Sequence, residues 1–371
     1  MKILKTLHLA SFDGNIGDNA NHFGFYKHLN LINDIEFKIT ELEIREFYWK
    51  QRFFDASFVE LVNSFDLLII GGGNYFELWV EDSPTGTSIA ITLELLTQIK
   101  TPILFNALGV DPGQGASNSS IHKFKNFLDV LIKRDDLISI RNDGAKKAII
   151  DYIGQDYLQY LYHTPDSGFF IETNEPSNYY KNKKYIAINV AYDMQDVRFK
   201  DISYQEFVIT FKKFITQFLI EYPEYEIVLV PHIYRDLEFI NNLIDKLDDN
   251  IRRRKLSIAP LLHGKDSFKE VMSIYKAAQV VLANRFHANI CSIGLKTPTI
   301  SLINYRQIKE LCNEIKYPFQ VDITQSGFDE NLLYNIKIAI STPYNSALSS
   351  KIHTDYEAYI HQVTLWLRRS T

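Results

Sequence analysis

Short apolar segments rich in branched side chains alternate along this chain with longer segments whose apolar residues recur at helical spacing. Strand character is present at residues 5–12, 65–71, 102–110, 137–142, 185–192, 226–232, 255–260, 279–284 and 298–302. Helical spacing is clear at residues 205–221, 235–248 and 266–277. Nearly continuous apolar strands that alternate with helices are typical of parallel sheets covered by helices on both faces. The pattern therefore predicts an α/β fold made of doubly wound, Rossmann-like sheets.

A polar stretch, ETNEPSNYYKNKK at residues 172–184, interrupts this alternation near the middle of the chain. The length of 371 residues fits two domains, since one domain usually takes roughly 100–200 residues. We expect an N-terminal Rossmann-like domain at 1–178, a second one at 179–345, and a C-terminal helix at 346–371 that packs back on the body. The apolar face of that last helix favours packing over its alternative meaning, a peripheral contact with a membrane.

Composition excludes several classes of protein. A hydrophobic content of 46% with 23% charged residues is ordinary for a soluble globular protein. The net charge of -5 argues against nucleic acid as a general partner, because binding to phosphates needs a basic surface. No apolar stretch reaches the roughly 18 residues of a membrane-spanning helix, and the start of the chain is typical of a strand and not of a signal peptide. Two cysteines cannot form a disulfide framework, so we expect a cytoplasmic protein.

Glycines concentrate in the first part of the chain, where ten of the sixteen lie within residues 1–115 and most follow strands directly. Ligands of parallel α/β sheets bind at the carboxyl ends of the strands. In the first such loop, FDGNIGDNANHFGF at 12–25, Gly14 and Gly17 permit tight turns, and Asp18 or Asn19 can cap the next helix. That helix start could hold an anion or a sugar hydroxyl, or could be an ordinary capped turn.

The second glycine loop lies in LLIIGGGNYFELW at residues 67–79. Consecutive glycines after a buried strand cost chain entropy, which favours a loop whose backbone a substrate approaches closely. Gly72, Gly73 and Asn74 are therefore candidates for binding a sugar, and the alternative is a steric need of the strand end. Farther on, Arg141 ends a strand and either binds an anion or forms a salt bridge with a nearby aspartate.

The segment ANRFHANICSIGLKTPTISL at 283–302 places Arg285 and His287 at the first turn of a short helix between two apolar strands. The N–H groups and dipole of a helix start favour an anion there. An arginine can bind a phosphate or carboxylate with two hydrogen bonds, and a histidine can donate a proton near neutral pH. The alternative is a capping arginine beside a half-buried histidine. His232 ends the strand 226–232 and would face the same crevice.

Other motifs of catalysis are missing from the sequence. The first glycine loop matches neither G-x-G-x-x-G nor the Walker pattern, and no G-x-S-x-G elbow is present. No histidine or cysteine pair has metal-ligand spacing, so we expect neither a metal nor a resident cofactor.

Five segments, in this order, resemble the polysaccharide pyruvyl transferase family. They are GNIGDNA at 14–20, DLLIIGGGNYF at 66–76, ISIRNDGAKK at 138–147, HTPDSGFF at 163–170 and VVLANRFHANICSIGLKTPTISL at 280–302. The R-x-H pair at 285–287 is the most specific of them, and the resemblance spans roughly residues 10–310. One departure is RNDG at 141–144, where the family often has Arg-Asp followed by a serine.

The resemblance implies a fold like the GT-B glycosyltransferases, with the active site in the cleft between two domains. It also implies transfer of a pyruvyl group from phosphoenolpyruvate to two hydroxyls of a sugar, which forms a cyclic ketal in bacterial capsule or other surface polysaccharide. The acceptor would be a sugar or a lipid-linked saccharide, and the enzyme would work in the cytoplasm or at the inner face of the membrane. The implied assignments are donor binding by Arg285, His287, Arg141 and His232, catalysis by His287 and Arg285, and acceptor binding by Gly14, Gly17, Asp18, Asn19, Gly72, Gly73 and Asn74.

Two other functions are compatible with the same sequence features. A GT-B glycosyltransferase would hold the diphosphate of a nucleotide sugar at residues 279–302, although the helix there lacks the acidic residue that such enzymes use for the ribose. A non-catalytic sugar-binding relative would keep the fold without needing the Arg285–His287 pair. A sugar-transfer enzyme with a histidine acid is a further alternative.

Overall fold

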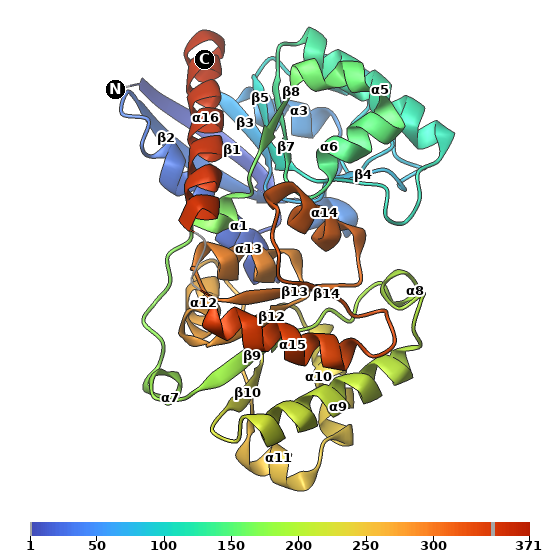
Figure 1. Cartoon of the computed structure of the whole chain (residues 1–371). Coiled ribbons are helices and arrows are strands. Elements are labelled where there is room, and N and C mark those ends of the chain that lie inside the picture. The colour runs from blue at the N-terminus through green and yellow to red at the C-terminus, as the bar shows by residue number, and fades with distance from the viewer. Residues whose placement is uncertain (1, 343–345) are drawn as a thin grey trace. The chain divides into compact units, whose positions relative to one another are not determined.

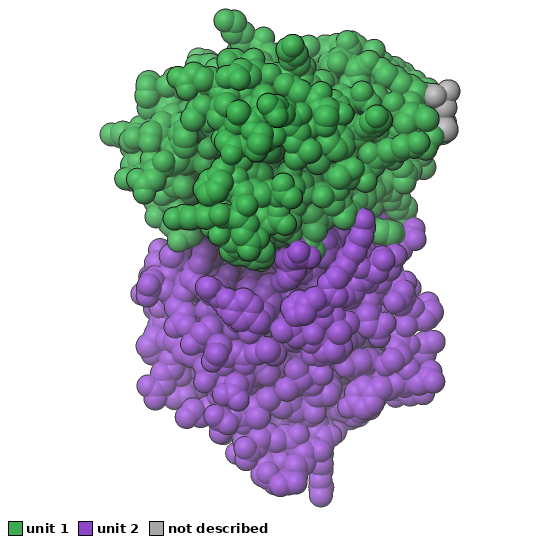
Figure 2. Space-filling model, turned by 180° about the vertical axis from the view of Figure 1, so that it is seen from behind, with its two compact units in different colours: residues 1–12, 22–167, 347–371 green, residues 13–21, 168–346 purple. Residues whose placement is uncertain are grey.

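The computed structural model describes residues 2–342 and 346–371, and its elements are shown in Figure 1. The chain forms two compact units, coloured separately in Figure 2. Unit 1 consists of residues 1–12, 22–167 and 347–371, and unit 2 of residues 13–21 and 168–346. The chain therefore passes to unit 2 at residue 168, earlier than the break expected near residue 178, and the short segment 13–21 also belongs to unit 2.

Unit 1 contains a six-stranded sheet in the order β2-β1-β3-β5-β7-β8, in which all neighbours are parallel. Its strands are β1 (Lys2–Ala10), β2 (Ile35–Glu43), β3 (Leu67–Gly71), β5 (Ile103–Leu108), β7 (Leu137–Arg141) and β8 (Leu161–Thr164). Every residue of β3, β5 and β7 is buried, as expected for strands covered on both faces. A separate two-stranded parallel sheet pairs β4 (Phe76–Glu77) with β6 (Val110–Asp111).

Three helices of unit 1 begin at side chains that accept hydrogen bonds from their first N–H groups. Asp55, Thr92 and Ser117 each accept such bonds, at the starts of α3, α4 and α5. The helical elements are α1 (Ile16–Leu29), α2 (Arg45–Tyr48), α3 (Ala56–Asn63), α4 (Leu93–Gln98), α5 (Asn118–Lys133), α6 (Ala145–Ala148), η1 (Ile149–Ile153) and η2 (Gln155–Tyr160). The short helix η3 (Ser167–Phe170) begins at the last residue of unit 1 and continues in unit 2. Helix α1 begins in unit 2 and continues in unit 1.

Unit 2 contains a second six-stranded parallel sheet, in the order β11-β10-β9-β12-β13-β14. Its strands are β9 (Tyr185–Asn189), β10 (Glu226–Leu229), β11 (Leu256–Ile258), β12 (Val280–Ala283), β13 (Thr299–Ile303) and β14 (Gln320–Asp322). Its helices are α7 (Asn178–Lys181), α8 (Gln195–Arg198), α9 (Tyr204–Glu221), α10 (Asp236–Lys246), α11 (Asp249–Arg254), α12 (Ser267–Ala277), α13 (Phe286–Gly294), α14 (Arg306–Ile315) and α15 (Phe328–Ser341). An aromatic face of α9 packs beside α10 and α15, with Phe207, Phe211 and Phe214 completely buried.

The last helix, α16 (Ser346–Ser370), packs on unit 1. Figure 1 shows it running alongside the sheet of that unit. Its buried residues include Tyr359 and Trp366. The Tyr359 hydroxyl bonds the Ser139 hydroxyl at 2.9 Å, and the Trp366 indole donates to the Asp135 carbonyl at 2.8 Å. These buried hydrogen bonds fix the helix against unit 1.

The expected fold class is confirmed, because two doubly wound parallel α/β sheets are present. All nine predicted strand segments contain strands, with ends shifted by a few residues. The predicted helices at 205–221, 235–248 and 266–277 correspond to α9, α10 and α12. Sequence reasoning missed β2, β8 and β14, which are edge strands of the six-stranded sheets, and the short strand β4.

Candidate functional site

The turn between β12 and α13 carries Arg285 and is fixed by buried asparagines. Asn284 accepts the N–H of Ala191 at 3.0 Å and donates to the carbonyl of Leu302 at 2.8 Å. Asn189 accepts the N–H of Arg285 at 2.9 Å. Because these bonds join the chain segments after β9, β12 and β13, the carboxyl edge of the sheet holds the start of α13 in one conformation.

Two carboxylates orient the guanidinium of Arg285. Its Nε lies 2.8 Å from Asp236 Oδ2, and its Nη2 lies 3.0 Å from Asp193 Oδ1. The Arg285 side chain is 14% exposed and that of Asp236 only 1%. Burial by itself lowers the pKa of Arg285, but the negative charges of Asp236 and Asp193 outweigh it and raise the pKa above its ordinary value. Arg285 is therefore a permanent cation in a fixed orientation.

One edge of the same guanidinium is not used by these carboxylates. All hydrogen bonds of Arg285 side-chain nitrogens to the described residues involve Nε and Nη2. Nη1 makes none with residues 2–342 or 346–371. The arrangement leaves Nη1 for an oxygen of a ligand, such as a phosphate or a carboxylate.

Asp236 also connects Arg285 to His232. Its Oδ2 accepts the backbone N–H of His232 at 2.9 Å, and His232 Nε2 lies 2.8 Å from the Tyr275 hydroxyl. His232 is 1% exposed. Burial, followed by the charges of Arg285 and His287, lowers the pKa of His232 well below its ordinary value. His232 is therefore a neutral hydrogen-bonding group and supplies no positive charge near neutral pH.

His287 lies on the first turn of α13 and faces the first turn of α1. Its Nδ1 is 3.7 Å from Asp18 Oδ1, and both side chains are largely buried. A Cβ atom on Gly17 would lie 2.6 Å from Cβ and Nδ1 of His287, so only glycine fits this contact. Gly14, Gly17, Asp18 and Asn19 all belong to unit 2. The predicted acceptor residues of the first loop thus lie in the same unit as Arg285 and His287.

A second arginine, Arg198 at the end of α8, extends the charged cluster of unit 2. It donates to Asn304 Oδ1 at 3.1 Å and lies 3.6 Å from Asp193. Its guanidinium stands 5.0 Å from the centre of the Tyr305 ring. Burial raises the pKa of Asp193, but Arg285 and Arg198 lower it more, which leaves a net decrease. Asp193 is therefore ionised and bridges the two arginines.

Arg141, the remaining predicted donor ligand, lies in unit 1 and is paired with acids. Its Nε donates to Asp143 Oδ2 at 2.6 Å, and its Nη1 lies 3.5 Å from Asp166 Oδ2. The Arg141 side chain is 3% exposed. This geometry corresponds to the salt-bridge alternative that the sequence left open, in which two carboxylates already balance the charge of Arg141.

The glycine loop of unit 1 packs against the chain around residues 106–109. Gly72 donates to the Asn106 carbonyl at 2.9 Å and has a φ of 86°, a conformation that favours glycine. Gly73 accepts the N–H of Gly109 at 3.0 Å. Asn74 is partly exposed and donates to Asp111 Oδ2 at 3.2 Å. Local packing thus explains why glycines occupy positions 72 and 73. Asn74 is the residue of this loop whose side chain is partly accessible.

The sequence matches the model of one protein family over most of its length. That family is described as polysaccharide pyruvyl transferase, and the match covers residues 15–306. This chain belongs to the polysaccharide pyruvyl transferase family. The family resemblance stated from the five sequence segments is therefore confirmed. Among proteins of curated function, none matches the sequence.

Solved structures with a similar fold are GT-B-type enzymes. A putative UDP-N-acetylglucosamine 2-epimerase from Listeria monocytogenes has a TM-score of 0.58 at 11% identity, over 95% of this chain and 91% of that one. The UDP-GlcNAc 2-epimerase of Methanocaldococcus jannaschii has a TM-score of 0.56 at 12% identity, over 93% and 94%. An α,α-trehalose-phosphate synthase from Burkholderia vietnamiensis has a TM-score of 0.51 at 9% identity, over 98% of both chains. At these identities the likeness establishes a GT-B-type fold for this pyruvyl transferase family member.

Three residues of the site were not predicted from the sequence of this family member. Asp193 and Arg198 lie in a polar segment after β9, and neither stands in a recognisable motif. Asp236 is the first residue of α10, after the loop that follows β10, and stands in no motif either. Asp193 and Asp236 form ion pairs with Arg285, which is distant in sequence. Arg198 pairs with nearby Asp193 and donates a hydrogen bond to the distant Asn304. The one available signal was their position just after the carboxyl ends of parallel strands.

In the described part of the chain, no three histidine, cysteine or acidic side chains gather in a way that could hold a metal ion. Within residues 2–342 and 346–371, no helix has both the length and the apolarity needed to cross a bilayer.

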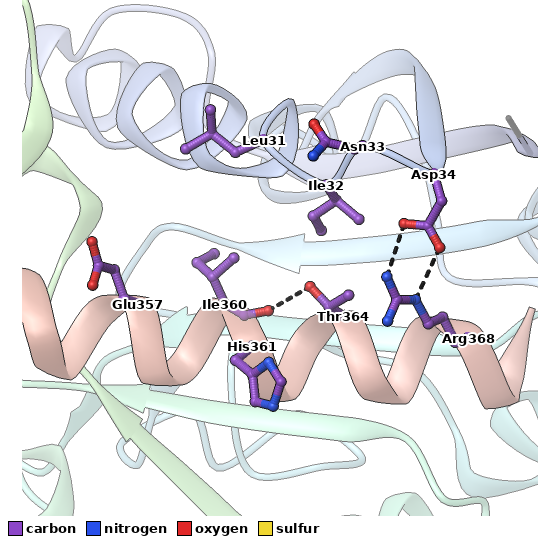
Figure 3. Close-up of a pocket in the computed structure, with 9 residues that line it drawn as sticks. All are labelled: Leu31, Ile32, Asn33, Asp34, Glu357, Ile360, His361, Thr364 and Arg368. Carbon is purple, nitrogen blue, oxygen red and sulfur yellow. Dashed lines mark hydrogen bonds and ion pairs between the residues drawn. The ribbon is translucent and has the colours of Figure 1, made fainter.

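A groove of about 520 Å³ lies in unit 1 between α16 and the turn after α1. Figure 3 shows its lining and the paired bonds of Arg368 to Asp34. The lining residues are Leu31, Ile32, Asn33, Asp34, Glu357, Ile360, His361, Thr364 and Arg368. None of the predicted site residues is among them, so the groove is separate from the candidate site.

Proposed function

We propose that this protein transfers a pyruvyl group from phosphoenolpyruvate to two hydroxyl groups of a sugar, forming a cyclic ketal and releasing phosphate. Membership of the polysaccharide pyruvyl transferase family supports this reaction class. The single observation that carries the proposal is the Arg285–His287 pair at the first turn of α13, with Arg285 oriented by Asp236 and Asp193. The acceptor is a sugar or a lipid-linked saccharide of a surface polysaccharide.

Donor binding is assigned to Arg285 because of the donor's charge. Phosphoenolpyruvate carries about three negative charges near neutral pH and needs fixed cationic groups or helix N-termini. Arg285 supplies a permanent charge, and its Nη1 edge is not used by Asp236 or Asp193. The start of α13 adds N–H groups and the positive end of its dipole. His232 contributes hydrogen bonds in its neutral form.

His287 is assigned as the general acid. Its imidazolium gives a proton to the methylene carbon of the donor, whose double-bond electrons form the new C–H bond. One sugar hydroxyl then adds to the cationic C2 and releases a proton that can recharge His287. The C2–O bond to phosphate breaks with its electron pair on phosphate. The second hydroxyl adds to C2, and its proton is taken up by phosphate or water.

The acceptor site is proposed at the loop of Gly72, Gly73 and Asn74, where the Asn74 amide can bond a sugar hydroxyl. Arg141 is proposed as a secondary donor ligand only, because Asp143 and Asp166 already neutralise it.

Titration calorimetry with phosphoenolpyruvate, UDP-sugars and CMP-sugars tests the proposal. We expect the wild type to bind phosphoenolpyruvate, and Arg285→Ala to weaken binding by at least tenfold, since a charge-assisted bond contributes about 1.5–3 kcal/mol. Arg285→Lys keeps the charge without the planar fork and should bind with intermediate affinity. Arg254→Ala, which removes an exposed arginine of the same unit, is the matched control and should bind normally.

Circular dichroism of Arg285→Ala must show a folded protein, because the substitution leaves Asp236 and Asp193 without this partner. Binding of a nucleotide sugar without any response to phosphoenolpyruvate would overturn the proposal in favour of a glycosyltransferase. Binding of sugars alone would favour a non-catalytic sugar-binding protein.

A further inference from the structure

The first turn of α1 packs directly against the imidazole of His287. Gly17 stands so close that an added Cβ would lie 2.6 Å from Nδ1 of the ring. The segment 13–21, which contains Gly17, belongs to unit 2 although unit 1 residues precede and follow it. The chain thus brings this turn to the R-x-H helix, and the next residue, Asp18, faces the ring.

The carboxylate of Asp18 is held in place from its other side. Asn15 Nδ2 donates to Asp18 Oδ2 at 3.0 Å, and Asn15 Oδ1 accepts the N–H of Gly17 at 3.0 Å. The second oxygen, Oδ1, lies 3.7 Å from His287 Nδ1. Side-chain exposure is 13% for Asp18 and 9% for His287, so water screens the two groups little. The distance is within the range of an ion pair and longer than a hydrogen bond.

We propose that Asp18 is a positioning residue that holds His287 in the tautomer with a proton on Nδ1, so that Nε2 delivers the proton to the donor. A carboxylate beside one ring nitrogen favours the neutral tautomer that carries its proton on that nitrogen. This inference depends on the proposed function, and it changes the expected role of Asp18 from acceptor binding to control of the general acid. His232, whose pKa is lowered by burial and by the charges of Arg285 and His287, is neutral.

Asp18→Asn tests the role by removing one charge with almost no change of shape. We expect kcat for pyruvyl transfer to fall about 10- to 100-fold, as for other groups that orient a catalytic or metal-bound histidine. The KM for phosphoenolpyruvate should change less than threefold, because Arg285 and the start of α13 are intact. Asp13→Asn removes the same charge from an exposed position in the same loop and should keep the wild-type kcat.

A second measurement detects the tautomer of His287 directly and does not require phosphoenolpyruvate. Long-range proton–nitrogen NMR spectra distinguish the two neutral tautomers, and comparison with His287→Gln assigns the signals of His287. We expect the Nδ1-protonated form to dominate in the wild type and to lose its excess in Asp18→Asn. Asp13→Asn should give the wild-type spectrum.

The results of these measurements distinguish failure of the positioning role of Asp18 from failure of the proposed pyruvyl-transfer function. A kcat of Asp18→Asn within twofold of the wild type with an unchanged tautomer overturns the inference, as does a rise in KM alone. If the wild type does not use phosphoenolpyruvate, the proposed function fails and the tautomer measurement decides the role of Asp18. If Asp18→Asn does not fold, Asn15→Ala releases Oδ2 of Asp18 and should lower kcat by a smaller factor at unchanged KM; an unchanged kcat there contradicts the inference.

Discussion

Glu77 is a carboxyl group in unit 1 whose surroundings oppose its negative charge. It pairs across the two-stranded sheet with Asp111 and accepts a hydrogen bond from the Ser88 hydroxyl. Burial, with a smaller contribution from Asp111, raises the pKa of Glu77 from its ordinary 4.5 to about 7. The folded protein therefore keeps a proton on Glu77 at pH values where the unfolded chain has lost it. Folding is favoured by this group at low pH and not at high pH.

We predict that Glu77→Gln removes this pH dependence. Relative to the variant, the wild type should lose about 3 kcal/mol in free energy of unfolding between pH 4.5 and pH 8, since one pKa unit corresponds to about 1.4 kcal/mol. Most of the loss should occur below pH 7, where the raised pKa of Glu77 lies. Urea unfolding of both proteins over this range measures the gap. Glu60→Gln, at an exposed position of unit 1, is the control, and a gap for Glu77→Gln that stays constant would contradict the prediction.

At the site, the sequence predicted the residues that stand in a local pattern and missed those that act across the fold. Arg285 and His287 were found because a strand, a short helix and a second strand surround them in sequence. Asp193 and Arg198 were not found, since the ion pairs of Asp193 join the segment after β9 to Arg285 at the start of α13 and to Arg198 in α8. Asp18 was predicted to bind the acceptor, and its proximity to His287 was not predicted, because nothing in the sequence shows that 13–21 belongs with unit 2.

At the scale of elements, the buried central strands were predictable, whereas of the four edge strands of the two six-stranded sheets only β11 was predicted. Strand β3 is apolar at every position before Gly71, and all five of its residues are buried. Strand β2, IEFKITELE, lies at the edge of the sheet and has only two fully buried residues, so its apolar signal is diluted by charged side chains. An apolar pattern in the sequence identifies a strand most readily when the strand is buried, and strands at the edge of a sheet are the least buried.

The C-terminal helix α16 offers a matched pair of neighbouring residues with opposite environments. Trp366 is 3% exposed and bonds the Asp135 carbonyl, whereas Leu365 is 46% exposed. Trp366→Ala should lower the free energy of unfolding by about 3–5 kcal/mol through the lost burial and the cavity left behind. Leu365→Ala should cost less than about 1 kcal/mol. Urea unfolding followed by circular dichroism compares them, and equal losses would show that α16 does not stabilise unit 1 through this face.

At the scale of the whole molecule, the two units differ in how the chain builds them. The main hydrophobic cluster of unit 2 comes from residues 186–339, and its sheet lies within residues 185–322. Unit 1 is assembled from three separate segments, and its last one, 347–371, supplies α16. A continuous segment with its own core has what a domain needs to fold alone, whereas unit 1 requires a helix from the far end of the chain.

We therefore predict that residues 168–346 fold as an isolated fragment and that residues 22–167 do not. The first fragment should unfold cooperatively in urea. Its variant Phe211→Ala, at a fully buried position, should lose about 3–5 kcal/mol, while Ile209→Ala, 51% exposed, should lose less than about 1 kcal/mol. The second fragment lacks both β1 and α16, so the hydroxyl of Ser139 and the carbonyl of Asp135 lose the partners that Tyr359 and Trp366 provide. A gradual, non-cooperative transition for 168–346, or equal effects of its two variants, would mean that the core of unit 2 is not sufficient and that the segment 13–21 or unit 1 is needed to complete it.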